Sequence, residues 1–204
     1  AIAVPLNFRY TAQEIEYCVQ LADVDVLLFG PEFIGRVEDV APSLSRGRLL
    51  FFVGENCPSF AEDYHTATAN CSSEPPKVLI QDEDDAAIYY SSGTTGFPKA
   101  ILLTHRCLLQ AARRGHEDVF LCIPPLYHTG AKMHWFGSLF TGSRAVLLKG
   151  NSPKAIFDAV SNEGCTIVWL LVPWAQDILD AIESGRINLD HYLLDQWRLM
   201  HIGA

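Results

Sequence analysis

Short, continuously apolar runs that alternate with amphipathic stretches are the feature of this sequence that most restricts its fold. Residues 24–29 and 49–53 are apolar almost throughout, and between them Phe33, Val37 and Val40 recur at helical spacing. Apolar runs of this kind form strands that are buried on both faces, as in parallel sheets covered by helices. The sequence therefore predicts an α/β fold with mostly parallel sheets flanked by helices.

The first helix has a distinct start signal. Thr11 and Glu14 stand three residues apart, the spacing at which a threonine hydroxyl and a glutamate carboxylate each accept a hydrogen bond from the other residue's backbone amide. This capping-box pattern predicts a helix over residues 12–22.

A change in composition divides the chain. Residues 54–85 contain Pro75-Pro76 and the acidic run Asp82–Asp85, which predict a linker that crosses the surface. The chain is therefore expected to divide into residues 1–85, part of a first α/β subdomain plus the acidic linker, and residues 86–204, a second α/β subdomain. In the second part the predicted strands are 87–90, 101–103, 119–123, 145–148, 166–171 and 198–202, and the predicted helices are 105–114, 131–140, 153–163 and 174–184.

Composition excludes several classes of function. The 204 residues carry a formal net charge of −9, which argues against binding to nucleic acid or to an anionic membrane surface. The longest apolar run, residues 167–175, is too short to cross a bilayer, so no stable membrane insertion is expected. The six cysteines contain no C-x-x-C pair and are expected to be reduced thiols, which favours a cytoplasmic location. The oligomeric state cannot be predicted from these features.

The most informative stretch is the loop at residues 91–99, which reads Ser-Ser-Gly-Thr-Thr-Gly-Phe-Pro-Lys directly after a predicted strand. Glycines let successive backbone amides turn inward, hydroxyls donate hydrogen bonds to phosphate oxygens, and lysine neutralises charge. This pattern predicts a polyphosphate-binding loop, with a flexible Ser/Thr/Gly turn as the alternative. It is not a Walker A loop, because Lys99 is followed by Ala100 and an apolar strand instead of a hydroxyl residue and a helix.

These residues carry a family resemblance. The stretch from Tyr90 to Lys99, followed by residues 102–106, resembles the phosphate-loop signature of the adenylate-forming (AMP-binding) superfamily, of the acyl-CoA synthetase or fatty-acid–CoA ligase type. Residues 4–7 and 124–130 resemble two further segments of that family, the second being its acyl-pocket segment. The resemblance spans essentially the whole chain and implies an incomplete N-terminal domain, in which residues 86–204 hold both the phosphate loop and the acyl-pocket segment.

The resemblance implies roles for individual residues. The loop would surround the β- and γ-phosphates of ATP, with Lys99 at its base. His128 would border the carboxylate near the α-phosphate, as the catalytic position, and Gly203 and Ala204 would contact adenine or the acyl group. The implied reactants are ATP with Mg²⁺, a small carboxylic acid, and coenzyme A as co-substrate. The loop residues so assigned are Ser91, Ser92, Gly93, Thr94, Thr95 and Gly96.

Departures from the family pattern point to a partial site. Ala100 stands where the family often has Gly, and the Tyr-Gly-x-Thr-Glu segment, the ribose-binding Asp and the C-terminal lid domain with its catalytic Lys are all missing from this sequence. The magnesium-binding Glu is missing with them, so no metal ligand is assigned in this chain. We therefore expect a fragment of a longer enzyme that is inactive alone.

Two other readings stay open at this point. One is a non-catalytic nucleotide-binding module that keeps the fold without the lid. The other is an amino-acid-activating adenylation domain, although the Asp expected just after the histidine segment is not present in Ala131-Lys132-Met133. On the residues alone, His128 is equally compatible with a core histidine, and Lys132 and His134 with either the acyl pocket or the solvent.

Overall fold

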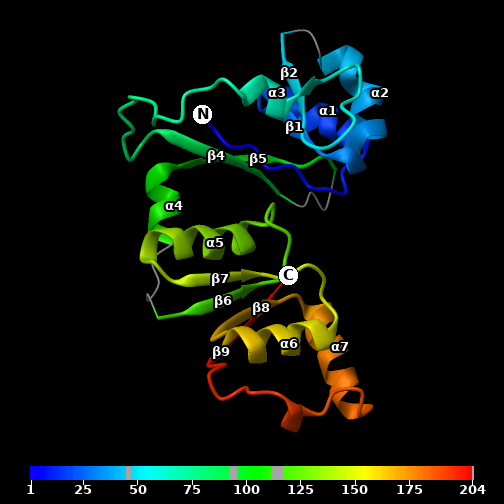
Figure 1. The fold of residues 1–204 in the computed structure, drawn as a ribbon, viewed down its shortest axis with the longest axis vertical. Helices are drawn as coiled ribbons and strands as arrows, with labels where there is room; N and C mark the ends of the chain where they lie inside the picture. Colours follow the sequence, from blue (N-terminus) through cyan, green and yellow to red (C-terminus); the bar gives the residue numbers. More distant parts are fainter. Residues whose placement is uncertain (45–46, 92–95, 112–116, 204) are drawn as a thin grey trace. The chain divides into compact units, whose positions relative to one another are not determined.

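The computed structural model describes all residues except 45–46, 92–95, 112–116 and 204 (Figure 1). The chain forms two compact units, unit 1 from Ala1 to His105 and unit 2 from Arg106 to Ala204. The division that the sequence analysis places after residue 85 stays a prediction about subdomains.

Unit 1 begins with helices packed on a small parallel sheet. Its strands lie in the order β1-β2-β3, and β1 pairs with β2 in a register that runs from Val26 opposite Leu49 to Phe29 opposite Phe52. The elements are α1 (Ala12–Leu21), β1 (Val26–Phe29), the 3-10 helix η1 (Pro31–Phe33), α2 (Ile34–Leu44), β2 (Leu49–Phe52), β3 (Glu62–Asp63) and α3 (Tyr64–Thr68).

The capping box predicted for the first helix is present. The Glu14 amide donates to the Thr11 hydroxyl oxygen at 3.3 Å, and the Thr11 amide donates to the Glu14 carboxylate at 2.8 Å. Two of the backbone donors at the helix N-terminus are satisfied in this way. The prediction that a helix begins at residue 12 is confirmed.

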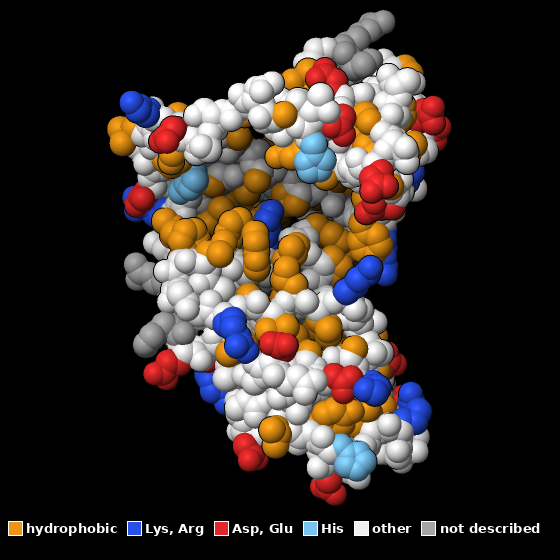
Figure 2. Space-filling model, viewed as in Figure 1, with side chains coloured by type: hydrophobic (Ala, Val, Ile, Leu, Met, Phe, Trp, Pro, Cys, Tyr) orange, Lys and Arg blue, Asp and Glu red, His pale blue; other side chains and the backbone are white. Residues whose placement is uncertain are grey.

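The core of unit 1 lies between the sheet and its helices. Cys18 and Val19 of α1, Val37 of α2 and Phe52 of β2 are almost completely buried in it. In β1 the residues that alternate with the buried ones are exposed, as Leu28 shows with 52% of its surface accessible. Figure 2 shows further hydrophobic side chains on the molecular surface among charged ones.

Two details of unit 1 differ from the sequence prediction. The expected linker 54–85 contains β3 and the short helix α3, whose first turn is capped by Asp63 accepting from the Thr66 amide at 2.7 Å. In addition, β4 (Asp85–Tyr90) and β5 (Ala100–Thr104) form a separate antiparallel pair, where a mostly parallel sheet is expected. The nine-residue connection explains this pairing, because a parallel crossover needs a dozen or more residues.

Unit 2 is built on a four-stranded parallel sheet in the order β7-β6-β8-β9. Its predicted strands and helices are found close to the expected positions, apart from the end of the first helix, which lies outside the described residues. The elements are α4 (His105–Ala111), β6 (Val119–Cys122), α5 (Thr129–Thr141), β7 (Arg144–Leu147), α6 (Pro153–Glu163), β8 (Ile167–Leu170), α7 (Val172–Glu183), the 3-10 helix η2 (Leu189–His191) and β9 (Leu199–Ile202).

The helices of unit 2 cover both faces of its sheet. Leu121 and Val168 pack with α6 and α7, whereas their neighbours Phe120 and Ile167 pack with Ala131 of α5. Because successive strand residues point to opposite faces, α5 lies on one side and α6 and α7 lie on the other. The fold is therefore α/β with parallel sheets flanked by helices, as predicted.

A polar clamp at the amino ends of the strands holds β9 in place. The Arg198 guanidinium donates to both oxygens of Asp118, from Nη2 at 2.5 and 2.7 Å and from Nε at 3.1 Å. The Thr166 hydroxyl donates to the same carboxylate at 3.0 Å. These bonds join residues next to β6, β8 and β9, and so align the three strands.

Among the described residues, no helix is both long enough and apolar enough to span a membrane.

The cysteines provide a test of the packing. None of the six forms a disulfide, and burial raises the pKa of Cys18, Cys122 and Cys165 to about 11, whereas Cys71 and Cys107 are exposed. Because the thiolate is the reactive form, an alkylating reagent at mildly alkaline pH should label the two exposed thiols first. Peptide mass spectrometry measures this order, with the urea-unfolded protein as the control. Labelling of Cys122 as fast as Cys71 in the folded protein would contradict the packing.

Candidate functional site

The predicted phosphate loop is held closed at its base in unit 1. The Ser91 amide donates to the Lys99 carbonyl at 3.0 Å, and the Lys99 amide donates to the Ser91 hydroxyl at 3.2 Å. These bonds continue the ladder of β4 and β5, whose last pair is Tyr90 with Ala100. The two strands run side by side in Figure 1. The loop therefore joins the ends of two paired strands and does not open a helix.

The described part of the loop is anchored to the first helix. The Phe97 ring stacks on Tyr17 of α1 with ring centroids 4.6 Å apart, and Pro98 is buried. At the other side, the Tyr90 hydroxyl donates to the carbonyl of Cys18 at 2.5 Å. Both ends of the loop are thus fixed to α1.

Two of the predicted loop residues have the properties that a phosphate site needs. Gly96 has a φ of +150°, a conformation that residues with a side chain rarely adopt, and both Gly96 and Lys99 are exposed. Backbone amides and a lysine at such a turn are available to an anion. The predicted residues Ser92, Gly93, Thr94 and Thr95 lie outside the described residues.

The acyl-pocket segment follows β6 in unit 2. The His128 amide donates to the Pro125 carbonyl at 2.9 Å, and the His128 carbonyl accepts from the Lys132 amide at 3.0 Å, so His128 is the N-cap of α5. Its ring stacks on Tyr127, with centroids 4.9 Å apart.

Gly203 follows β9 directly, and its amide donates to the Leu170 carbonyl at 3.1 Å. The predicted residue Ala204 lies outside the described residues.

Partial burial affects the two ionisable groups at this helix start. Although the His128 side chain remains exposed to solvent, loss of hydration lowers its pKa from the usual 6.5 and favours the neutral imidazole. Desolvation also lowers the pKa of Lys132, whose ammonium lies 5.9 Å from the centroid of the Phe136 ring. Within the described ranges, no three His, Cys, Asp or Glu side chains come together as a metal site.

Of the two alternatives that the sequence leaves open for His134, the acyl pocket or the solvent, the structure excludes the solvent. The His134 side chain is only 6% exposed. The centroid of its ring lies 4.0 Å from the ring centroid of Phe120 and 6.1 Å from that of Trp169. The ring of His201 on β9 is 5.9 Å from that of His134. The histidine therefore packs between α5 and the sheet and does not face solvent.

The sequence analysis missed Trp169. This residue lies on β8, and its indole is so close to Gly130 that a Cβ built on the glycine would lie 1.6 Å from the ring. The glycine stands two positions after the predicted pocket residue His128, but 38 residues lie between Gly130 and Trp169 and hide the contact from any local pattern. A tryptophan inside an otherwise aliphatic strand was the available signal.

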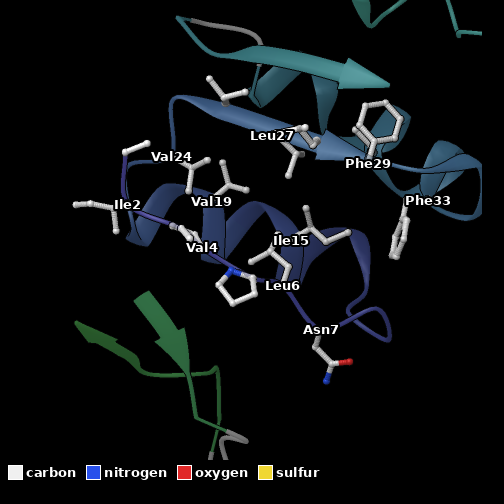
Figure 3. Close-up of a pocket in the computed structure, with 16 residues that line it drawn as sticks. Ile2, Val4, Leu6, Asn7, Ile15, Val19, Val24, Leu27, Phe29 and Phe33 are labelled. Atoms are coloured by element: carbon white, nitrogen blue, oxygen red, sulfur yellow. The ribbon is translucent and has the colours of Figure 1, made fainter. Parts of the chain in front are cut away.

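Unit 1 also contains an apolar cavity of about 620 Å³ (Figure 3). Side chains of the N-terminal segment, α1 and β1 line it, and they include Val4, Ile15 and Leu27. The one polar side chain in the lining, Asn7, already accepts a hydrogen bond from the Arg9 amide at 2.9 Å. The cavity offers no charged side chain to a phosphate, so we do not assign the phosphate site to it.

The lowered pKa of His128 can be measured directly. We expect NMR titration of the folded protein to give a midpoint below 6.5, because the charged imidazolium is less well hydrated there. Protonation then favours the unfolded state, so lowering the pH through this range should cost stability. In urea the same ring should titrate at about 6.5. A folded midpoint at or above the unfolded one would contradict the described environment.

The curated relatives of this chain include CoA ligases. Among curated relatives, the chain is 29% identical over 222 residues to 4-coumarate–CoA ligase 5 of Oryza sativa subsp. japonica, a match that covers 100% of the chain and 38% of the relative. It is 26% identical over 215 residues to 3-oxocholest-4-en-26-oate–CoA ligase of Rhodococcus rhodochrous, covering 91% of the chain and 38% of the relative. The chain thus spans about two fifths of the length of these relatives.

The fold has close counterparts among solved structures. The anthranilate CoA ligase AuaEII in complex with anthranoyl-AMP superposes with a TM-score of 0.83 at 21% identity, over 99% of this chain and 40% of that one. At this identity the likeness establishes the fold, which is that of the N-terminal domain of adenylate-forming enzymes. The family model of the AMP-binding enzymes matches residues 1–204. This match over the whole chain shows that the protein belongs to the AMP-binding enzyme family.

Proposed function

We propose that this chain supplies the phosphate- and acid-binding part of an AMP-forming acyl-CoA synthetase. The observation that carries the proposal is the glycine- and hydroxyl-rich loop closed between Ser91 and Lys99, in a chain whose relatives are acyl-CoA ligases. Since the chain spans about two fifths of those relatives, we infer that further residues complete the enzyme and that this chain alone is inactive.

The proposed reaction has two steps. A carboxylate oxygen of the acid attacks the α-phosphorus of ATP and forms acyl-AMP. The bond from that phosphorus to the oxygen that bridges it to the β-phosphorus breaks, and pyrophosphate leaves. The thiol of coenzyme A then attacks the acyl carbon, loses its proton and displaces AMP. Such a transfer depends on positioning the reactants and neutralising charge, so a loop rich in donors is sufficient without a protein nucleophile.

Each loop residue has a part in the proposal. Backbone amides and hydroxyls from Ser91 to Gly96 surround the β- and γ-phosphates, and the exposed ammonium of Lys99 neutralises charge at the base. Mg²⁺, for which we assign no ligand in this chain, would neutralise part of the phosphate charge. The strand pairing at Ser91 and Lys99 supports the proposal, because it keeps the ends of the loop together without using the Lys99 side chain.

His128 and Gly203 border the acid and the adenylate in the proposal. Both follow strands of one parallel sheet, whose carboxyl ends share one edge. A neutral imidazole at the start of α5 can donate one hydrogen bond to a carboxylate without forming a salt bridge, and a salt bridge would make the carboxylate a weaker nucleophile.

We further propose that the enzyme acts in the cytoplasm.

Removing the Lys99 ammonium tests the phosphate role. In the longest polypeptide that the source gene encodes, Lys99→Ala should raise the KM for ATP by roughly 10- to 100-fold, the range for losing a hydrogen bond to a charged group. The KM for the acid should change little. The measurement is pyrophosphate release from ATP, with and without short, long and aromatic carboxylic acids.

Lys77→Ala is the matched control, because Lys77 is an exposed lysine outside the loop and its loss should leave both constants within about twofold. An equal loss for ATP and acid in Lys99→Ala would argue against the phosphate role. No acid-dependent release from the unaltered protein would favour a non-catalytic module, and release with amino acids alone would favour an adenylation domain.

A further inference from the structure

The sheet of unit 2 has a point at which its strand order reverses. From β6 the chain passes through α5 on one face to β7, and then returns through α6 on the opposite face to β8 on the other side of β6. In open parallel sheets, ligands bind outside the carboxyl ends of the strands at this reversal. The reversal lies between β6 and β8, where the segment with His128 leaves β6.

Trp169 occupies the α5 side of this reversal. The residue is next to last in β8, and ring atoms Cζ3 and Cη2 lie 1.6 and 1.7 Å from where a Gly130 Cβ would be. The indole Nε1 lies 3.8 Å from where a Gly203 Cβ would be. The ring therefore reaches from the first turn of α5 to the end of β9, and so touches both segments that the proposed function assigns to the acid and the adenylate.

The space behind the indole is already filled. The buried His134 packs edge-on to Trp169 at an interplanar angle of 75°, and its ring also packs against Phe120. Trp169 itself is only partly buried, so part of the indole is accessible. A group that approaches from the His128 and Gly203 segments would meet this accessible part and could not pass between α5 and β8.

We propose that Trp169 forms the floor of the acid-binding site and restricts the enzyme to short-chain carboxylic acids. This inference rests on the proposed function and names its substrate class. The indole packs on Gly130 because only a residue without a side chain admits it so closely. The tryptophan and the glycine therefore act as a pair that fills the space a longer acyl chain would need.

Shortening the side chain tests the inference. In the longest polypeptide that the source gene encodes, kcat/KM for acid-dependent pyrophosphate release is measured over straight-chain acids from acetate to dodecanoate. The unaltered protein should prefer the short acids. In Trp169→Ala the ratio of kcat/KM for long over short acids should rise by about 10- to 200-fold, the range for a change of pocket size by one methylene or more.

Trp197→Ala is the matched control. Trp197 packs on Phe157 in the core on the opposite face, and precedes β9 at the other end of the sheet. Its removal should lower stability without changing the order of acid preference. If Trp169→Ala does not fold, Trp169→Leu and Trp169→Phe provide smaller steps in size, and the preferred chain length should increase in the order Trp, Phe, Leu.

The outcomes separate the two claims. An active unaltered protein that prefers long acids, or an unchanged profile in every folded Trp169 variant, would overturn the inference and leave the proposed function standing. No acid-dependent pyrophosphate release from the unaltered protein would overturn both. Gly130→Ala gives a second check, because its new Cβ must displace the indole and should also change the acid profile.

Discussion

Burial of the two central strands of unit 2, β6 and β8, on both faces is the constraint on which the proposed acid site depends. Because Phe120 and Leu121 both need apolar partners, helices must cover both sides of the sheet, and the chain must cross it between successive parallel strands. All four strands then end at one edge. His128 and Gly203 reach that edge only as a consequence of packing elsewhere, and the clamp of Arg198 on Asp118 keeps β9 in line.

Among its described residues, the predicted phosphate loop of unit 1 has no helix N-terminus with which to hold an anion. Many phosphate loops use the N-terminus of a helix, where free amides and the helix dipole attract an anion. Here the loop joins two antiparallel strands, so in the proposed site the positive charge would come from Lys99 and the hydrogen bonds from the turn itself. The stacking of Phe97 on Tyr17 and the hydrogen bond from Tyr90 to the Cys18 carbonyl give this turn a rigid base.

Local sequence patterns predicted where the helices and strands lie better than they predicted which strands pair with each other. The capping box at Thr11 and the apolar runs of β1, β6 and β8 depend on neighbours in sequence, and the structure has these elements where they were expected. Strand pairing is not encoded locally, so the antiparallel partnership of β4 and β5 was missed although both strands were predicted. The two-residue strand β3 is too short to leave a pattern of its own.

In the candidate site, too, the residues in local motifs were predicted, whereas a residue that matters through a distant contact was not. Ser91, Gly96, Lys99 and His128 were predicted as site residues because their residue types stand in recognisable motifs, and these roles stay predictions. Trp169 was missed because its significance comes from Gly130, on another element, and a buried strand residue looks the same whether or not it lines a site. Contacts across a sheet are set by topology, which a single sequence reports only through resemblance.

Amide hydrogen exchange with a stable acyl-adenylate analogue tests the central claim most directly, because it shows where the reaction intermediate would sit. The experiment uses the longest polypeptide of the source gene, with peptides resolved by mass spectrometry. The account predicts slowed exchange in the peptides that carry Ser91 to Lys99 and in those that follow β6 and β9. Protection confined to the residues around the apolar cavity of unit 1, or no protection at saturating analogue, would contradict it.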